Sequence, residues 1–288
     1  MDSLLKQIET LMPKLSKGQK KIADFIINQY DKAAFMTALK LGNEVGVSES
    51  TVVRFANALG FEGFPELQGT LREMVKNKLT SLQRYEIAFD KMANKDILPK
   101  VISSDIAKLR STLEQIDKGQ FDEAVEAILK AGKIYILGVR SSSALASFLG
   151  FYLNLLFDNV KLVNTTSVSE MFEQILHVKK EDVVVGITFP RYSRRTVKAL
   201  EYAKKEGASV IGITDTQQSP VANCCDILLL AESDMVSFVD SLVAPMSVIN
   251  ALIVALGMRK KDEMTDTLNK LENIWDEYNV YNKEHQDG

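Results

Sequence analysis

Two stretches rich in hydroxyl groups and arginine each follow an apolar segment of the chain. Residues 138–146 read GVRSSSALA, and residues 188–196 read TFPRYSRRT. Hydroxyl groups and free backbone amides at the start of a helix bind anions, and arginines add charge-assisted hydrogen bonds. Two such loops facing each other would hold a small phosphorylated polyol. The hydroxyl groups that we favour as ligand contacts are those of Ser141, Ser142, Ser193 and Thr196.

Each of these stretches also has a simpler interpretation. Serines at a helix start are common caps, and Ser193 has the position to cap a helix that contains Thr196. Arg194 and Arg195 then become solvated residues of that helix. The presence of two such loops after strands of one predicted sheet favours ligand binding over capping alone.

A third stretch, residues 45–61, reads VGVSESTVVRFANALGF and has the pattern of a helix-turn-helix. Gly46 supplies a turn residue that tolerates positive φ, and Gly42 is the small residue that lets two helices cross closely. The second helix turns one apolar face toward the first. The residues of that face are Val52, Phe55, Ala56 and Leu59.

The opposite face of this helix carries groups that read DNA. Arginine binds guanine O6 and N7 in two-point fashion, and asparagine binds adenine N6 and N7. Ser48 is expected to cap the helix, and hydroxyl groups near its start can bond phosphates or base edges. We favour DNA reading over a trihelical protein-interaction module with a merely solvated arginine. The candidate DNA-binding residues are Ser48, Ser50, Thr51, Arg54 and Asn57, with Glu49 and Val53 also facing outward.

The segments that must position these residues differ between the two ends of the chain. The first 75 residues show only helical periodicity, and residues 66–90 and 97–116 read as polar amphipathic helices. From about residue 121, short aliphatic runs alternate with helical stretches, which is typical of a parallel sheet covered on both faces. The predicted strands are 133–139, 160–164, 182–189, 208–215 and 226–231.

This pattern predicts an α plus α/β protein, with an all-helical helix-turn-helix domain joined by a helical connector to a doubly wound, five-stranded α/β sandwich. The tail keeps helical spacing from Met264 to Tyr278, so we expect a helix that packs on its own domain or on a second copy. The predicted limits are 1–77, 78–120, 121–260 and 261–288 for the helix-turn-helix domain, connector, α/β domain and C-terminal helix.

The composition indicates neither a disordered chain nor a membrane protein, and the charge differs between the two ends of the chain. With 288 residues, 46% hydrophobic and 25% charged, the chain reads as an ordinary globular protein of about two domains. Residues 1–84 hold 12 basic and 9 acidic side chains, whereas the whole chain carries a net charge of −3, which suggests a basic module followed by an acidic one.

Cysteine and histidine usage predicts neither a disulfide nor a metal site. The two cysteines, Cys224 and Cys225, are adjacent, and only His177 and His285 accompany them. We find no signal sequence and no apolar run that could span a bilayer, because Pro245 and Asn250 break the longest one. We therefore expect a cytoplasmic protein with no metal or other cofactor and no membrane partner.

The residues above carry a resemblance to a known family. GVSESTVVRFANALGFEGFPEL (46–67) resembles the helix-turn-helix of the RpiR/MurR family of bacterial transcriptional regulators, and the two hydroxyl-rich loops resemble the phosphate-side loops of its sugar isomerase (SIS) domain. ITDTQQSPVANCCD (213–226) is also similar in style, so the resemblance covers residues 1 to about 260. It implies a dimeric, cytoplasmic, DNA-binding regulator that senses a phosphosugar or related metabolite.

Carried over by position, the resemblance adds Ser143 and Thr188 to the effector contacts, and we include Arg191 with them. The chain departs from the family pattern at Arg140, where many SIS domains have a glycine, and in TFPRYS, which replaces a Ser-x-Ser-Gly pattern. Both changes add bulk and positive charge, so the effector is either more acidic than a hexose phosphate or shares its pocket with arginine side chains.

A sugar-phosphate isomerase or lyase is the alternative function. Such an enzyme needs a carboxylate base near the sugar and an acid for ring opening. Glu170, Glu173 and His177 follow the second strand but form no clear acid–base pair, and an enzyme needs no arginine-bearing corner. We therefore expect a regulator rather than an enzyme. Its partners would be an operator in double-stranded DNA, a second copy of the chain or a larger homo-oligomer, and an effector that biases the spacing of two reading helices.

Overall fold

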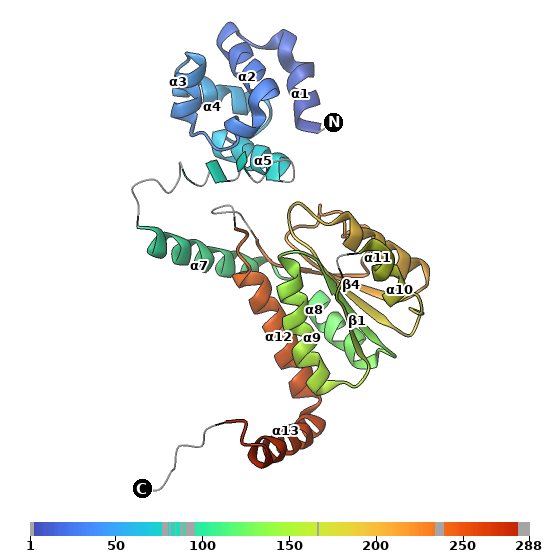
Figure 1. Cartoon of the computed structure of the whole chain (residues 1–288). Coiled ribbons are helices and arrows are strands. Elements are labelled where there is room, and N and C mark those ends of the chain that lie inside the picture. Colours follow the sequence, from blue (N-terminus) through green and yellow to red (C-terminus); the bar gives the residue numbers. More distant parts are fainter. Residues whose placement is uncertain are drawn as a thin grey trace, which may run out of the picture. The chain divides into compact units, whose positions relative to one another are not determined.

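A computed structural model describes residues 3–76, 80, 82–83, 85–86, 89, 96–165, 167–233 and 239–281. The contacts within the chain divide it into two units, residues 1–94 and residues 95–288 (Figure 1). Residues 77–79, 81, 84, 87–88 and 90 of the helix predicted at 66–90 lie outside the described residues, and the finer domain limits given above stay a prediction.

The N-terminal unit is helical throughout its described residues, because its apolar side chains recur at helical spacing and meet in one core. Ile22, Ile26, Leu41, Phe55 and Leu67 have no exposed surface. A capping box between Ser16 and Gln19 starts the second helix. The helices are α1 (Ser3–Leu11), η1 (Met12–Lys14), α2 (Lys17–Ala33), α3 (Ala38–Val45), α4 (Glu49–Ala58) and α5 (Phe64–Lys76).

The corner between α3 and α4 has the geometry that the sequence predicts. Gly46 ends α3 in the left-handed conformation, with φ of 70°. A Cβ atom on Gly42 would lie 2.7 Å from the carbonyl oxygen of Val47, so α3 and the turn approach too closely for any larger residue. These two glycines let α4 pack its buried face, formed by Val52, Phe55 and Ala56, against α3.

The C-terminal unit contains a five-stranded sheet in the order β2-β1-β3-β4-β5, in which every neighbouring pair is parallel. The strands are β1 (Ile134–Gly138), β2 (Val160–Val163), β3 (Val183–Ile187), β4 (Ser209–Thr214) and β5 (Ile227–Leu230). Their helices are α7 (Ile97–Gln115), α8 (Lys118–Lys130), α9 (Ser142–Leu156), α10 (Val168–Ile175), α11 (Arg194–Lys205), α12 (Val243–Arg259) and α13 (Lys261–Glu277). The predicted fold class is confirmed.

Two cores cover the faces of this sheet, which explains why its strands are nearly continuously apolar. Side chains of α8, α9 and α12 pack on one face. Side chains of α10 and α11 pack on the other face, so the sheet lies between two helical layers (Figure 1). Every residue of β1 and β3, the central strands, is buried.

Helix α13 makes only marginal contact with its own unit. It turns away from α12 by 99°, and none of its side chains is buried. Met264 packs at the edge of the core, but Leu268, Ile274 and Tyr278 are exposed. Of the two alternatives for this tail, packing on its own domain is therefore limited to one end of the helix.

Three further properties concern the described residues. No single helix among them has both the length and the apolar composition to cross a membrane, although the bent pair α12 and α13 passes that test jointly. No cluster of three or more His, Cys, Asp or Glu side chains within the described ranges has a metal-binding arrangement. Cys224 and Cys225 are both free thiols.

Candidate functional site

The first candidate site is the outer face of α4. Ser48, Ser50, Arg54 and Asn57 are exposed and Thr51 is half-buried, so all five predicted DNA-binding residues lie at the surface or partly so. Glu49 is also exposed, whereas Val53 is half-buried. The helix therefore presents a polar face of the kind that enters a DNA groove.

The hydroxyl groups at the start of α4 differ from the prediction in one respect. Ser48 occupies the N-cap position, but its hydroxyl makes no capping hydrogen bond to the backbone. It lies instead 3.0 Å from the hydroxyl of Ser50 and 2.9 Å from that of Thr51. Arg54 Nη2 donates to the Thr51 hydroxyl at 3.3 Å. The expected cap is thus replaced by a hydroxyl cluster that holds Arg54 along the first turn of its own helix.

Asn57 has a local structural role that the sequence did not indicate. With its amide oriented to satisfy both of its polar atoms, Asn57 Nδ2 donates to the carbonyl oxygens of Phe61 at 3.1 Å and Glu62 at 3.3 Å. These bonds brace the loop that follows Gly60, whose φ is 90°. Reading an adenine with both amide atoms would require breaking them.

The second candidate site lies at the carboxyl ends of β1 and β3. The chain leaves β1 toward β2 on one side and leaves β3 toward β4 on the other, so these neighbouring strands form the switch point of the sheet. Ligands of doubly wound sheets bind in the crevice outside such a switch point. Both hydroxyl-rich loops begin there, since they follow Gly138 and Ile187 directly.

The loop after β1 is tightly constrained. A Cβ atom on Gly138 would lie 2.5 Å from the carbonyl oxygen of Ser142, so only glycine fits at this strand end. Arg140 adopts a left-handed conformation with φ of 57°, and its carbonyl oxygen accepts hydrogen bonds from the backbone and the hydroxyl of Ser143 at 3.0 and 2.6 Å. Ser142 is buried and Ser141 is exposed. The Ser143 hydroxyl is therefore engaged, and the Ser141 and Ser142 groups are the better candidate donors.

The loop after β3 is held by a chain of short-range hydrogen bonds. Ser193 donates its backbone amide to the Thr188 hydroxyl at 3.1 Å, and its own hydroxyl accepts from the Thr196 amide at 3.4 Å as the N-cap of α11. Thr196 is completely buried, and its hydroxyl has no hydrogen-bond partner. Since an unsatisfied buried hydroxyl costs about 1–3 kcal/mol, this site carries an unmet demand for a polar contact.

Both loops contain an arginine in the left-handed region. Arg191 has φ of 67°, and Arg140 and Asn279 are the other non-glycine residues with positive φ within the described ranges. Such conformations cost about 1–3 kcal/mol each and concentrate at ligand-binding sites. Arg140, which stands where many SIS domains have a glycine, therefore adopts a conformation that glycine would adopt without strain.

Two polar groups in the segments that follow β3 and β4 were not among the predicted site residues. Tyr192 donates its hydroxyl to Asp215 Oδ1 at 2.8 Å, which ties the loop after β3 to the end of β4. Ser219, in the segment between β4 and β5, is buried with an unpartnered hydroxyl. Asp215 was detectable in principle, because a carboxylate directly after a parallel strand lies at the ligand-binding edge of the sheet.

The residues considered for catalysis form no acid–base pair in the described part of the chain. Glu170 accepts a hydrogen bond from Thr165, and Glu173 and His177 are exposed near the end of α10. Carboxylates in such positions belong to the wet face of an amphipathic helix.

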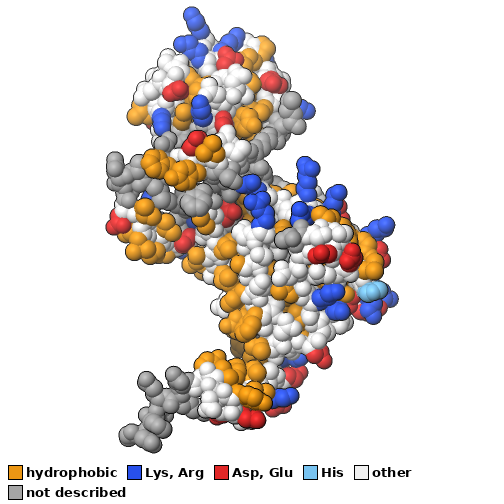
Figure 2. Space-filling model, in the orientation of Figure 1, with side chains coloured by type: hydrophobic (Ala, Val, Ile, Leu, Met, Phe, Trp, Pro, Cys, Tyr) orange, Lys and Arg blue, Asp and Glu red, His pale blue; other side chains and the backbone are white. Residues whose placement is uncertain are grey.

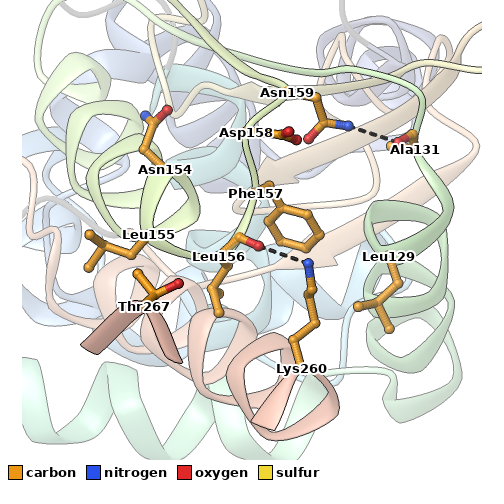
Figure 3. Close-up of a pocket in the computed structure, with 10 residues that line it drawn as sticks. All are labelled: Leu129, Ala131, Asn154, Leu155, Leu156, Phe157, Asp158, Asn159, Lys260 and Thr267. Atoms are coloured by element: carbon orange, nitrogen blue, oxygen red, sulfur yellow. Dashed lines mark hydrogen bonds between the residues drawn. The ribbon is translucent and has the colours of Figure 1, made fainter. Parts of the chain in front are cut away.

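A separate pocket opens at the other edge of the sheet (Figure 3). Its volume is about 540 Å³, and it lies before β2, where α9 ends and α12 meets α13. Lys260 donates to the Leu156 carbonyl oxygen at 2.9 Å and lies 4.6 Å from the Phe157 ring centre, while Asn159 Nδ2 donates to Ala131 at 3.0 Å. This pocket contains none of the predicted effector residues, and its one cation is already engaged.

Comparison with known proteins also divides the chain into an N-terminal and a C-terminal domain. Residues 2–78 match the helix-turn-helix domain of the rpiR family, and residues 127–255 match the SIS domain. The chain is 26% identical over 269 residues to the transcriptional regulator HexR of Pseudomonas aeruginosa, with 90% of this chain and 91% of HexR aligned.

Solved structures give the same result. The sugar isomerase domain of an RpiR transcription factor from Sphaerobacter thermophilus is 28% identical, with a TM-score of 0.59 and coverage of 62% of this chain and 99% of that domain. The Vibrio vulnificus NanR protein, solved with ManNAc-6P, has the same fold at 19% identity, with a TM-score of 0.58 and coverage of 95% of this chain and 98% of NanR.

Proposed function

Because the chain belongs to the RpiR-type helix-turn-helix transcriptional regulators that carry a SIS domain, we propose that it reads an operator with α4 and senses a phosphosugar or related acidic metabolite. The observation that carries this proposal is the combination of the arginine-bearing helix with two hydroxyl-rich loops at the switch point of the sheet. The alternative, a sugar-phosphate isomerase or lyase, lacks an acid–base pair and would leave the helix-turn-helix unused.

The surface of α4 supports DNA reading by Arg54 and its neighbours. Arg54 is exposed and supplies a planar fork for guanine, while the hydroxyl groups of Ser48, Ser50 and Thr51 lie near the start of the helix, where phosphates and base edges are within reach. Asn57 contributes to base reading only if it exchanges its hydrogen bonds to the following loop for bonds to a base.

Seven residues of the switch-point loops are candidates for effector binding, and they differ in whether their polar groups are available to a ligand. Ser141 and Ser142 supply hydroxyl groups in the first loop, and the buried, unpartnered Thr196 hydroxyl has the strongest unmet demand in the second. Ser193 and Thr188 shape the second loop through their hydrogen bonds, as Ser143 does for the first. Arg191 adds positive charge. The binding of ManNAc-6P by NanR, a protein of the same fold, makes a sugar phosphate the first class to test.

Dimerisation is part of the proposal, since one helix-turn-helix reads too few bases for useful affinity. An exposed apolar surface on α9, α12 and α13 supports self-association through the SIS unit, and hydrophobic side chains gather over α12 and α13 in Figure 2. Phe151, Val254 and Met258 have 63%, 52% and 76% of their surface exposed. The site of action would be the cytoplasm, where the operator lies.

The test begins with a selection of DNA duplexes from a randomised library by the full chain, followed by a thermal-shift screen of sugar phosphates. We expect one enriched sequence and a rise in melting temperature with at least one sugar phosphate. The variant that combines Ser142→Ala with Ser193→Ala should lose this shift, whereas Ser147→Ala, an exposed serine of α9, should keep it. An unchanged response in the double variant would rule out the switch-point site.

A further inference from the structure

We infer that three lysines of α2 form a clamp for the DNA backbone beside the reading helix. Lys17, Lys20 and Lys21, called the lysine patch below, are all exposed. The inference rests on the proposed function, because it takes α4 as the helix that enters the groove. It adds a second contact surface, on a different helix, to the one that the sequence predicted.

The first turn of α2 lies directly against the helix-turn-helix. A Cβ atom on Gly18 would lie 3.3 Å from Thr51 Cγ2 and 3.5 Å from Val47 Cγ1, so this glycine is packed on the turn and on α4. Gln19 Nε2 donates to the carbonyl oxygen of Arg54 at 3.4 Å. The lysines of the patch flank these two contact residues in the sequence, with Lys17 before them and Lys20 and Lys21 after them.

Lys21 lies beside the turn between α3 and α4. The Lys21 Nζ atom lies 3.9 Å from the position that a Cβ atom would take on Gly46, the turn residue between α3 and α4. An ammonium group thus lies beside the turn itself. A duplex that receives α4 passes its phosphates close to this turn, because the first helix of a helix-turn-helix, here α3, crosses the backbone and ends at Gly46.

The positions of these lysines lower the stability of α2. Lys17 and Lys20 occupy the first turn of α2 and Lys21 follows, although a helix N-terminus disfavours cations. The like charges of Lys17 with Lys20 and with Lys21 also repel across one turn. Residues 14–21 contain four lysines and no acid.

No ion pair within the described ranges neutralises this charge. Asp24, the first acid on α2, lies one turn from Lys20 and Lys21 but is not within ion-pair distance of either lysine, and three lysines outnumber this one acid. A cluster that folding disfavours and no protein group neutralises is typical of a surface that meets an anion. Duplex DNA offers a regular array, with one negative charge per about 1.7 Å of its axis.

The experiment measures the salt dependence of DNA binding. We would titrate the full chain with the selected duplex and with a random-sequence duplex over a series of potassium chloride concentrations. For the variant that combines Lys17→Gln, Lys20→Gln and Lys21→Gln, we expect the slope of log K against log salt to become shallower by about 4 to 5, since the proposed dimer carries two lysine patches and each lost phosphate contact removes about 0.9. Affinity should fall equally for both duplexes, because phosphate contacts carry no sequence information.

Lys32→Gln is the matched control. Lys32 is an exposed lysine in the last turn of the same helix, and it lies beyond the kink at Gln29, at the opposite end of α2 from Lys17. It should keep the wild-type slope. The triple variant should melt no lower than wild type, since its changes relieve repulsion, and this separates a lost contact from a damaged fold.

Two results would overturn the lysine patch: a triple variant with the wild-type slope on both duplexes, or a Lys32→Gln variant with the same change in slope as the triple variant. Failure of the proposed function looks different. In that case the selection enriches no sequence, while the random duplex still binds in a way that depends on the patch.

Discussion

Arg54 is held in place before any DNA arrives. Its bond to Thr51, and the contacts of Thr51 with Ser48, run along the exposed start of α4. This bond is long, at 3.3 Å, and exposed to water, so Arg54 can exchange it for a guanine at small cost. The hydroxyl cluster therefore limits the freedom of the arginine without blocking it.

Replacement of Arg54 tests its assignment as the base-reading residue. Arg54→Ala should weaken binding to the selected duplex by at least about 30-fold, because each of the two reading helices of the proposed dimer loses a two-point contact to guanine that contributes about 1–3 kcal/mol. The melting temperature and the effector response should stay at wild-type values, since Arg54 is exposed. Fluorescence anisotropy with labelled duplex measures the loss. Full sequence-specific affinity in Arg54→Ala would refute the assignment.

The sequence predicted residue types better than hydrogen-bond partners. It identified the hydroxyl-rich loops and the outward face of α4, because strand ends and helical periodicity determine those positions. It did not show that the Ser48 hydroxyl would turn from the backbone to Thr51, or that Asn57 would brace a loop. Several acceptors compete for each short polar side chain, and only the folded geometry decides among them.

At the scale of elements, glycines determine how closely the helices and strands approach. The small residue required at Gly42 and the positive φ required at Gly46 were both predicted from spacing and are both confirmed. The five strands were also predicted, since continuous apolar runs mark a sheet that is buried on both faces. The strand order was not predicted, because periodicity carries no information on which strands pair.

The corner between α3 and α4 can be tested with a single methyl group. Gly42→Ala should destabilise the N-terminal unit by about 1–3 kcal/mol, since the new Cβ atom meets the Val47 carbonyl oxygen at 2.7 Å and either the backbone or the crossing must move. Operator binding should fall with it, because α4 loses its support. Thermal unfolding followed by circular dichroism gives the change in stability.

Gly69→Ala is the control for this experiment. Gly69 lies in α5 with no atom within 4 Å of the added Cβ position, so the change should stabilise the helix by about 0.5–1 kcal/mol through its better helix propensity. If Gly42→Ala melts like Gly69→Ala, the close approach at the corner has no energetic consequence.

At the scale of the whole molecule, the exposed apolar surface of the C-terminal unit is where we expect two copies to meet. Surface side chains of α9 and α12 continue into α13, which buries none of its residues in one chain. Apolar patches of this kind usually mark interfaces. The sequence left open whether the tail packs on its own domain or on a second copy, because helical spacing alone does not identify the partner.

Charge placed on this surface should separate the copies. The variant that combines Phe151→Glu with Met258→Glu should be monomeric by light scattering and should bind the selected duplex far more weakly, since the two reading helices are no longer linked. Leu176→Glu is the control, because Leu176 is 58% exposed and follows α10 on the other face of the sheet. A double variant that keeps the wild-type mass would show that the copies meet elsewhere.

The proposed regulator binds two ligands, an operator and an effector, through one chain. An effector at the switch point alters operator affinity only if it binds two arrangements of the molecule with different affinity, and such coupling is typically 1–3 kcal/mol. Operator binding and effector binding must then influence each other by the same factor.

The most direct test measures operator affinity with and without a saturating sugar phosphate from the thermal-shift screen. For wild type we predict a change of about 5- to 150-fold in either direction. For the variant that combines Ser142→Ala with Ser193→Ala we predict operator affinity that no longer responds to the sugar phosphate. Equal wild-type affinity with and without a bound sugar phosphate would contradict the account.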